Sequence, residues 1–161
     1  MILHACLIAM RIARDWRGLL IQGPSGVGKS DLAFRALDHG FRLVADDRVV
    51  IFVSQGRLYG RSPSSLAGLI EVRGHGVMRR DCLPFARIAL AGRCVSGPDL
   101  IERLPDPMVQ TILGVSLPQF EVWPFEPASL NKLCNAIEYL GVEAQREYQT
   151  SFAAPKERAG A

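Results

Sequence analysis

The chain carries the stretch Gly23-Pro24-Ser25-Gly26-Val27-Gly28-Lys29-Ser30, which matches the phosphate-loop pattern G-x-x-x-x-G-K-[ST] at every fixed position. The apolar run 18–22 before it predicts a short buried strand, and apolar residues at helical spacing over 31–39 predict a helix that stops at Gly40. Glycines in such a loop let successive backbone N–H groups converge on phosphate oxygens. The sequence therefore predicts a nucleotide or phosphate site at 23–30.

Two polar side chains of this motif have expected roles in binding a Mg²⁺–nucleotide. Lys29 can reach the β and γ phosphates, and the hydroxyl of Ser30 can ligate the Mg²⁺ that bridges them. The helix that opens near Lys29 adds unpaired N–H groups and its positive dipole end. The alternative is a glycine-rich turn that only connects strand to helix, which the matching context on both sides disfavours.

Composition favours one globular domain. The chain has 161 residues, 48% of them hydrophobic, which is ample for one core. Its net charge of +3 comes without a basic run, so no nucleic-acid surface is expected. The apolar start is neither a signal peptide nor long enough to span a membrane. Four cysteines without a C-x-x-C pair suit a reduced cytoplasmic protein, although they could pair in an oxidising compartment.

The segment before the phosphate loop predicts an antiparallel strand pair. Residues 4–10 are predicted to form a strand with His4, Cys6, Ile8 and Met10 on one face. A polar turn at 14–18 then leads into the strand that precedes the loop. Strands joined by so short a turn pair antiparallel. On this basis alone, His4 is more simply a partly buried strand histidine than a functional one.

The strand predicted at 41–47 ends in two carboxylates, Asp46 and Asp47. In open α/β sheets, ligands gather at the carboxyl ends of strands. Neighbouring strand side chains point to opposite faces, so both acids can face one site only if the strand ends or twists there. One could ligate Mg²⁺ while the other accepts a proton from an attacking hydroxyl. The alternative is a solvated strand-end turn with ordinary surface acids.

A second informative stretch runs over 69–77 and contains Glu71 and Arg73. Two residues apart on a strand, these side chains project from the same face, just before a glycine-flexible turn. They could form an exposed ion pair of little consequence. Alternatively, Glu71 contacts the metal and Arg73 touches phosphate or acceptor. The residues alone leave both interpretations open.

The rest of the chain predicts further elements of an α/β domain. They are a hairpin at 49–60, a strand at 87–92, a loop at 98–107, an edge strand or entry segment at 114–122 broken at Pro118, and an amphipathic helix at 128–140. The expected architecture is a mixed β-sheet with flanking helices and the phosphate loop at one end. This domain is expected to span 1–142, followed by a mobile polar tail over 143–161.

Three motifs stand in a fixed order: the phosphate loop, Arg42-Leu43-Val44-Ala45-Asp46-Asp47, and Glu71-Val72-Arg73-Gly74-His75-Gly76. Over about residues 4–80 the chain resembles the catalytic domain of the HPr serine kinase/phosphorylase family. The resemblance implies a phosphate-loop kinase fold akin to phosphoenolpyruvate carboxykinase. It implies that ATP and Mg²⁺ serve to phosphorylate a seryl hydroxyl of HPr, the small phosphocarrier of the sugar phosphotransferase system. Many members also run the reverse phosphorolysis, and they typically assemble as hexamers.

The resemblance also implies roles by position. Asp46 resembles the general base that accepts the serine proton, and Asp47 and Glu71 resemble metal-associated carboxylates. The remaining roles are a direct Mg²⁺ ligand at Ser30, the phosphate clamp at Lys29, a histidine at the edge of the site at His4, and an arginine following the acid of the second signature at Arg73.

The chain departs from the family pattern in three places. It begins almost at the first catalytic strand, which predicts a short form without the amino-terminal domain of full-length members. His75 stands where the family has an apolar residue. A Pro-Gly-Arg-Asn segment that reaches the acceptor has no clear match in 117–132, where it is expected. Two other functions therefore stay open: an ATP-binding sensor without transfer activity, and a small-molecule phosphate-loop kinase.

Overall fold

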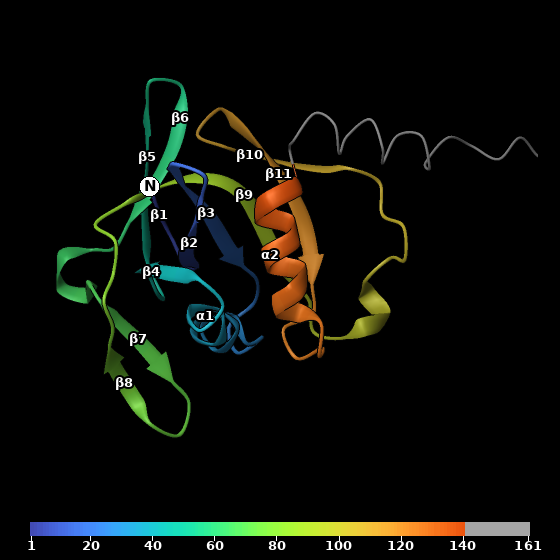
Figure 1. The fold of residues 1–161 in the computed structure, drawn as a ribbon, viewed down its shortest axis with the longest axis horizontal. Helices are drawn as coiled ribbons and strands as arrows, with labels where there is room; N and C mark the ends of the chain where they lie inside the picture. Colours follow the sequence, from blue (N-terminus) through green and yellow to red (C-terminus); the bar gives the residue numbers. More distant parts are fainter. Residues whose placement is uncertain (141–161) are drawn as a thin grey trace, which may run out of the picture.

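The centre of the fold is a hairpin of β2 (Cys6–Ile12) and β3 (Asp15–Gln22), drawn in blue in Figure 1. These strands pair antiparallel, with Cys6 opposite Ile21, so the predicted pair is confirmed. The computed structural model describes residues 1–140, and the predicted tail at 143–161 lies outside them. The phosphate loop joins β3 to helix α1 (Lys29–Leu37), which starts and ends two residues before the predicted bounds.

The hairpin belongs to a nine-stranded mixed sheet with the order β1-β5-β6-β9-β3-β2-β4, extended by β11 on β9 and β10 on β11. The pairs β3–β9 and β9–β11 are parallel and the others are antiparallel. The other strands of the sheet are β1 (Ile2–Leu3), β4 (Phe41–Ala45), β5 (Val49–Ser54), β6 (Arg57–Arg61), β9 (Ala86–Cys94), β10 (Met108–Ile112) and β11 (Val115–Val122). The mixed α/β sheet and the hairpin at 49–60 are as predicted.

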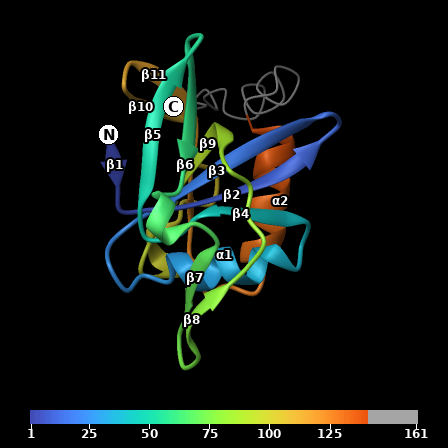
Figure 2. The ribbon, with the colours of Figure 1, turned by 90° about the vertical axis from the view of Figure 1, so that its left-hand side faces the viewer.

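Five further elements complete the described chain. A separate two-stranded hairpin of β7 (Leu69–Val72) and β8 (Gly76–Arg79) projects beside α1 (Figure 2). Helix α2 (Ser129–Tyr139) confirms the predicted C-terminal helix. Short 3₁₀ helices occur at Ser64–Leu66 and Pro98–Leu100.

Alternating side chains of the central strands build a core on each face of the sheet. Ile8 and Ile21 lie in one core with Leu32 of α1 and Leu133 of α2, so both helices cover this face. Leu7, Leu20 and Val49 belong to the other core, with further side chains of β5, β6, β10 and β11. The central strands β2 and β3 therefore contribute to both cores, and their register with each other is unbroken from Cys6–Ile21 to Ile12–Asp15.

Strand directions bring the predicted site residues to one edge of the sheet. β2 runs antiparallel to both β3 and β4, so its first residues lie beside the last residues of its neighbours, with Leu7 opposite Ala45. The start of β2, the loop after β3 and the acids after β4 therefore meet at one place.

Two predicted strand boundaries and one predicted strand position are wrong. β2 begins at Cys6, so His4 lies in the bend before it rather than within the strand. β7 ends at Val72, which leaves Arg73 in the turn. β11 is continuous through Pro118 and lies between β10 and β9 rather than at an edge. Its pairing with β9 begins at the residue after Pro118, so the missing N–H interrupts no bond on that side.

Two further findings concern the cysteines and the helices of the described residues. Cys6, Cys82, Cys94 and Cys134 all lie within the described residues and are free thiols. Over residues 1–140, helices that are long and apolar enough to cross a membrane do not occur.

Candidate active site

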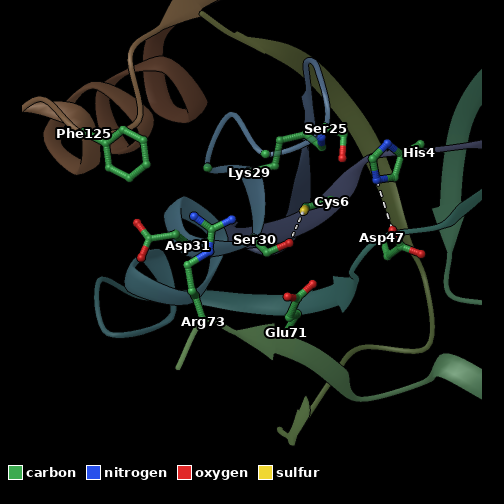
Figure 3. Close-up of a pocket in the computed structure, with 12 residues that line it drawn as sticks. His4, Cys6, Ser25, Lys29, Ser30, Asp31, Asp47, Glu71, Arg73 and Phe125 are labelled. Atoms are coloured by element: carbon green, nitrogen blue, oxygen red, sulfur yellow. Dashed lines mark hydrogen bonds and ion pairs between the residues drawn. The ribbon is translucent and has the colours of Figure 1, made fainter. Parts of the chain in front are cut away.

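A cavity of about 220 Å³ opens where the start of β2 meets the ends of β3 and β4 (Figure 3). Most of the predicted site residues line it. The lining residues are His4, Cys6, Ser25, Gly26, Gly28, Lys29, Ser30, Asp31, Asp47, Glu71, Arg73 and Phe125. Of the predicted residues, Gly23, Pro24, Val27 and Asp46 are not among them.

The phosphate loop is closed around the ammonium group of Lys29. This side chain is 6% exposed, and its Nζ donates hydrogen bonds to the carbonyl oxygens of Gly23 (2.9 Å) and Pro24 (2.8 Å). Gly28 precedes α1 in a left-handed conformation at φ 105°, and no side chain caps the helix. The first backbone N–H groups of α1 are therefore available to an anion.

Asp46 is buried under the floor of the cavity, with 4% of its surface exposed. Its Oδ1 accepts hydrogen bonds from Ser30 Oγ at 2.9 Å and from Cys6 Sγ at 2.7 Å. Its Oδ2 accepts one from the backbone N–H of Glu71 at 3.0 Å. Asp46 thereby links β4 to β2, α1 and β7.

Burial and the neighbouring carboxylate keep the Cys6 thiol protonated. Removal from water raises the pKa of Cys6 well above its usual range, and the negative charge of Asp46 raises that pKa further. A protonated thiol is a hydrogen-bond donor, which is the role that the 2.7 Å contact with Asp46 requires. Cys6 is thus part of the support of the site.

Asp47 has the opposite environment to Asp46. Its side chain is 58% exposed and lines the cavity, and its Oδ1 lies 3.1 Å from Nε2 of His4. Its Oδ2 lies 3.6 Å from Nε of Arg48. The strand ends at Ala45, and the backbone turns at Asp47 into the left-handed region at φ 64°. One acid is therefore buried under the cavity while the next opens onto it.

Glu71 and Arg73 reach the cavity from the β7–β8 hairpin. Both side chains are exposed, and the guanidinium of Arg73 points toward Asp31 in Figure 3. Among residues 1–140 the salt bridges do not include a Glu71–Arg73 pair. The ion-pair interpretation of this motif is therefore wrong, and both charged groups are free to meet a ligand.

The oxygen atoms near Ser30 suit a magnesium–phosphate complex better than a metal cage. Within the described part of the chain, groups of three or more His, Cys, Asp or Glu side chains at metal-binding distance do not occur. Mg²⁺ is usually held by one or two carboxylates together with water and substrate phosphates. Ser30 Oγ, which donates a hydrogen bond of 2.9 Å to Asp46 Oδ1, fits that pattern together with the carboxylates of Asp47 and Glu71 in the cavity lining.

Sequence reasoning missed three residues of the site: Cys6, Asp31 and Phe125. Strand alternation puts Cys6 on the same face as His4, but nothing in the sequence indicates its bond to Asp46. Asp31 follows the motif directly and lies in the first turn of α1. Phe125 comes from the loop between β11 and α2, and only the fold brings it to the phosphate loop.

The protein is a mixed α/β fold in which a loop with the phosphate-loop sequence motif lies beside two carboxylates. The family model described as HPr Serine kinase C-terminal domain matches residues 2–82. The chain belongs to the HPr serine kinase C-terminal domain family.

Relatives of the chain agree with this family. The HPr kinase/phosphorylases of Clostridium tetani and Clostridium beijerinckii are each 49% identical to it over 61 residues, which is 38% of this chain. The matched part spans 20% of the length of these relatives. The solved structure of the Hpr(Ser) kinase/phosphatase from Coxiella burnetii has a TM-score of 0.68 over 94% of this chain and 98% of that one. At 23% identity, this likeness shows the HPr kinase fold alone.

Proposed function

We propose that the chain is an ATP- and Mg²⁺-dependent protein kinase that phosphorylates a seryl hydroxyl of an HPr-like phosphocarrier. The observation that carries the proposal is that residues of the phosphate loop, the exposed Asp47 and Ser30 line one cavity, with Asp46 buried behind Ser30. Phosphoryl transfer asks a protein mainly to hold the phosphates, to neutralise charge and to align the nucleophile. The family and its relatives, described as HPr kinase/phosphorylases, support the same acceptor.

Binding of the triphosphate falls to the loop and to the residues around Ser30. The N–H groups of residues 23–30 and the ammonium of Lys29 would hold the phosphates. Ser30 would hold Mg²⁺ while its hydroxyl donates to the buried Asp46, with Glu71 in the cavity lining as a further oxygen donor. When bound, Mg²⁺ supplies positive charge beside the β and γ phosphates. Arg73, exposed in the cavity lining, adds a cation for the transferred group or the acceptor.

The geometry favours Asp47 as the general base, in place of Asp46. Asp46 is buried and already accepts three hydrogen bonds, whereas Asp47 is exposed and lines the cavity. In the proposed step, the seryl oxygen bonds to the γ-phosphorus as the bridging P–O bond to ADP breaks. The hydroxyl proton passes to the carboxylate of Asp47, and His4, at 3.1 Å, holds that carboxylate in place.

One observation favours a second function, a nucleotide-binding sensor that transfers no phosphate. The region 117–132, where the family resemblance implies a Pro-Gly-Arg-Asn segment that reaches the acceptor, has no clear match to it. A sensor would bind Mg–ATP and leave every acceptor unmodified.

The test uses the purified chain, Mg²⁺, γ-labelled ATP and the HPr-like carrier from the same source, followed by intact-mass analysis of the carrier. The kinase proposal requires a gain of one phosphate on a serine. Binding of ATP without any gain contradicts that proposal and supports the sensor. Label found in a small metabolite instead of protein supports a small-molecule kinase.

Matched variants test the two acids. Asp47→Asn is expected to lower the transfer rate by about 10²–10⁴-fold, as loss of a general base does, while ATP still binds. Asp46→Asn is expected to raise the Mg²⁺ concentration needed for half-maximal rate. Asp38→Asn, an exposed acid in the C-cap position of α1, is the control. Full activity of Asp47→Asn would contradict the assignment. Homo-oligomeric assembly remains a prediction from the family resemblance, and cytoplasmic location remains a prediction from the cysteine pattern.

A further inference from the structure

One wall of the cavity is an aromatic ring that the mechanism above does not use. Phe125 is 56% exposed, although a large apolar side chain is usually buried. The ring rests on the phosphate loop, since a Cβ added to Gly28 would lie only 2.8 Å from its Cζ atom. Gly28 thus leaves room for the ring, and the ring meets the end of the loop where α1 begins.

The loop that carries Phe125 is tied to helix α1 by one arginine. Arg35 donates hydrogen bonds from Nη2 to the carbonyl oxygen of Pro124 and from Nη1 to Ser129 Oγ at 3.2 Å. Its Nε donates to Asp31 Oδ2 at 2.8 Å. Because Pro124 directly precedes Phe125, the ring is held against the helix that follows the phosphate loop. The fold therefore holds the ring of Phe125 in its exposed position before any ligand binds.

The positions of the cavity residues give the site a direction. In Figure 3, Phe125 lies on one side of Lys29, and the His4–Asp47 pair lies on the other. A nucleoside triphosphate has its base at one end and its reacting phosphate at the other. With the phosphates on the loop and the γ-phosphate facing Asp47, the base is directed to the Phe125 side.

We propose that Phe125 is the stacking platform for the nucleobase of the bound nucleotide. The inference rests on the proposed function, because it takes the phosphate loop as the site of the triphosphate. A flat ring presents the same π face to any base, so stacking adds affinity without selecting adenine over guanine. Phe125 is then a binding residue for nucleoside triphosphates as a class.

The experiment measures binding by isothermal titration calorimetry in the presence of Mg²⁺. The probes are ATP, GTP and inorganic tripolyphosphate, which has the phosphates but no base. Phe125→Ala is expected to weaken ATP and GTP about tenfold, within the range that base–aromatic stacking supplies, and to leave tripolyphosphate unchanged. Phe125→Trp keeps a platform and is expected to bind ATP at least as well as the parent chain.

Phe85→Ala is the matched control, because Phe85 is also a phenylalanine, is 54% exposed and does not line the cavity. The inference is overturned if Phe125→Ala binds ATP as tightly as the parent chain. It is also overturned if all three probes weaken equally, because the ring then supports only the shape of the loop. A parent chain that binds neither ATP nor tripolyphosphate refutes the proposed function itself. The two failures are distinguishable, because the proposed function is tested on the parent chain alone and the stacking inference on the difference between the variants and the parent chain.

Discussion

The different burial of two adjacent acids predicts different effects of one substitution on stability. An asparagine at 46 has one acceptor oxygen where the carboxylate has two. The backbone N–H of Glu71 cannot turn away, so the amide oxygen must face it at the place of Oδ2. The amide NH₂ then faces Ser30 and Cys6, whose hydroxyl and thiol must reverse to accept. All three hydrogen bonds lose the strengthening that an ionised acceptor gives.

That strengthening sets the size of the effect. A bond to a charged group exceeds a neutral one by about 0.5–1.5 kcal/mol, so Asp46→Asn is expected to lower the free energy of unfolding by about 2 kcal/mol. For a domain of this length, the melting temperature then falls by roughly 4–8 °C. Asp47→Asn removes only exposed contacts, and asparagine tolerates the left-handed backbone at φ 64°. Its melting temperature is expected to change by less than about 2 °C.

Thermal unfolding at pH 7, followed by circular dichroism at one protein concentration, compares the two variants with the parent chain. The transfer assay on the same samples is expected to rank them differently, with Asp47→Asn the stable and inactive one. Equal melting temperatures for the two variants would show that the charge of Asp46 adds nothing to its hydrogen bonds, and the reasoning would be refuted.

Two further predictions concern the core. Gly60→Ala places a Cβ 2.6 Å from Cδ2 of the buried Leu7, and overpacking is expected to lower the free energy of unfolding by about 1–3 kcal/mol. Gly97→Ala, with open space around its Cβ, is the control, and equal urea midpoints for the two would contradict the packing argument. Burial raises the pKa of Cys94 from 9.0 to about 12. The contribution of the protonated thiol to the free energy of unfolding is therefore complete below pH 9, and it is lost as the pH rises toward 12. Between pH 9 and 12 the thiol of Cys94 binds fewer protons in the unfolded than in the folded chain. This group therefore lowers the free energy of unfolding by up to about 1.4 kcal/mol for each unit that the pH rises. The urea midpoint of the parent chain should therefore drop further between pH 8.5 and 10.5 than that of Cys94→Ala; identical drops would exclude this cause.

The phosphate loop could be predicted because its motif specifies its own surroundings. Glycines at fixed positions, an apolar run before them and helical spacing after them left only one local arrangement for residues 23–30. The antiparallel pair before the loop was also predictable, because a short polar turn leaves two strands no other way to pair.

The roles of Asp46 and Asp47 could not be assigned in the same way. Side-chain alternation indicated that the strand had to end or turn if both acids were to serve one site. It did not say which acid would be buried. That depends on the left-handed turn at Asp47 and on Cys6, Ser30 and Glu71, which come from three other elements.

Contacts distant in sequence explain the other differences. Pro118 suggested an edge because proline lacks an N–H, yet β9 begins to pair with β11 only at the next residue. Phe125 carried no local signal at all. Its loop reaches the phosphate site because Arg35, on a different element, holds it there.

The closed form of the phosphate loop gives the site a threshold for ligands. The ammonium of Lys29 is already satisfied by the carbonyl oxygens of Gly23 and Pro24. An incoming anion must bind that ammonium more strongly than two neutral carbonyl oxygens do. A ligand with several adjacent negative charges can do so, whereas a sugar hydroxyl or a single carboxylate gains little by the exchange. The hydrogen bonds of Lys29 within the loop thus favour ligands that carry several adjacent negative charges.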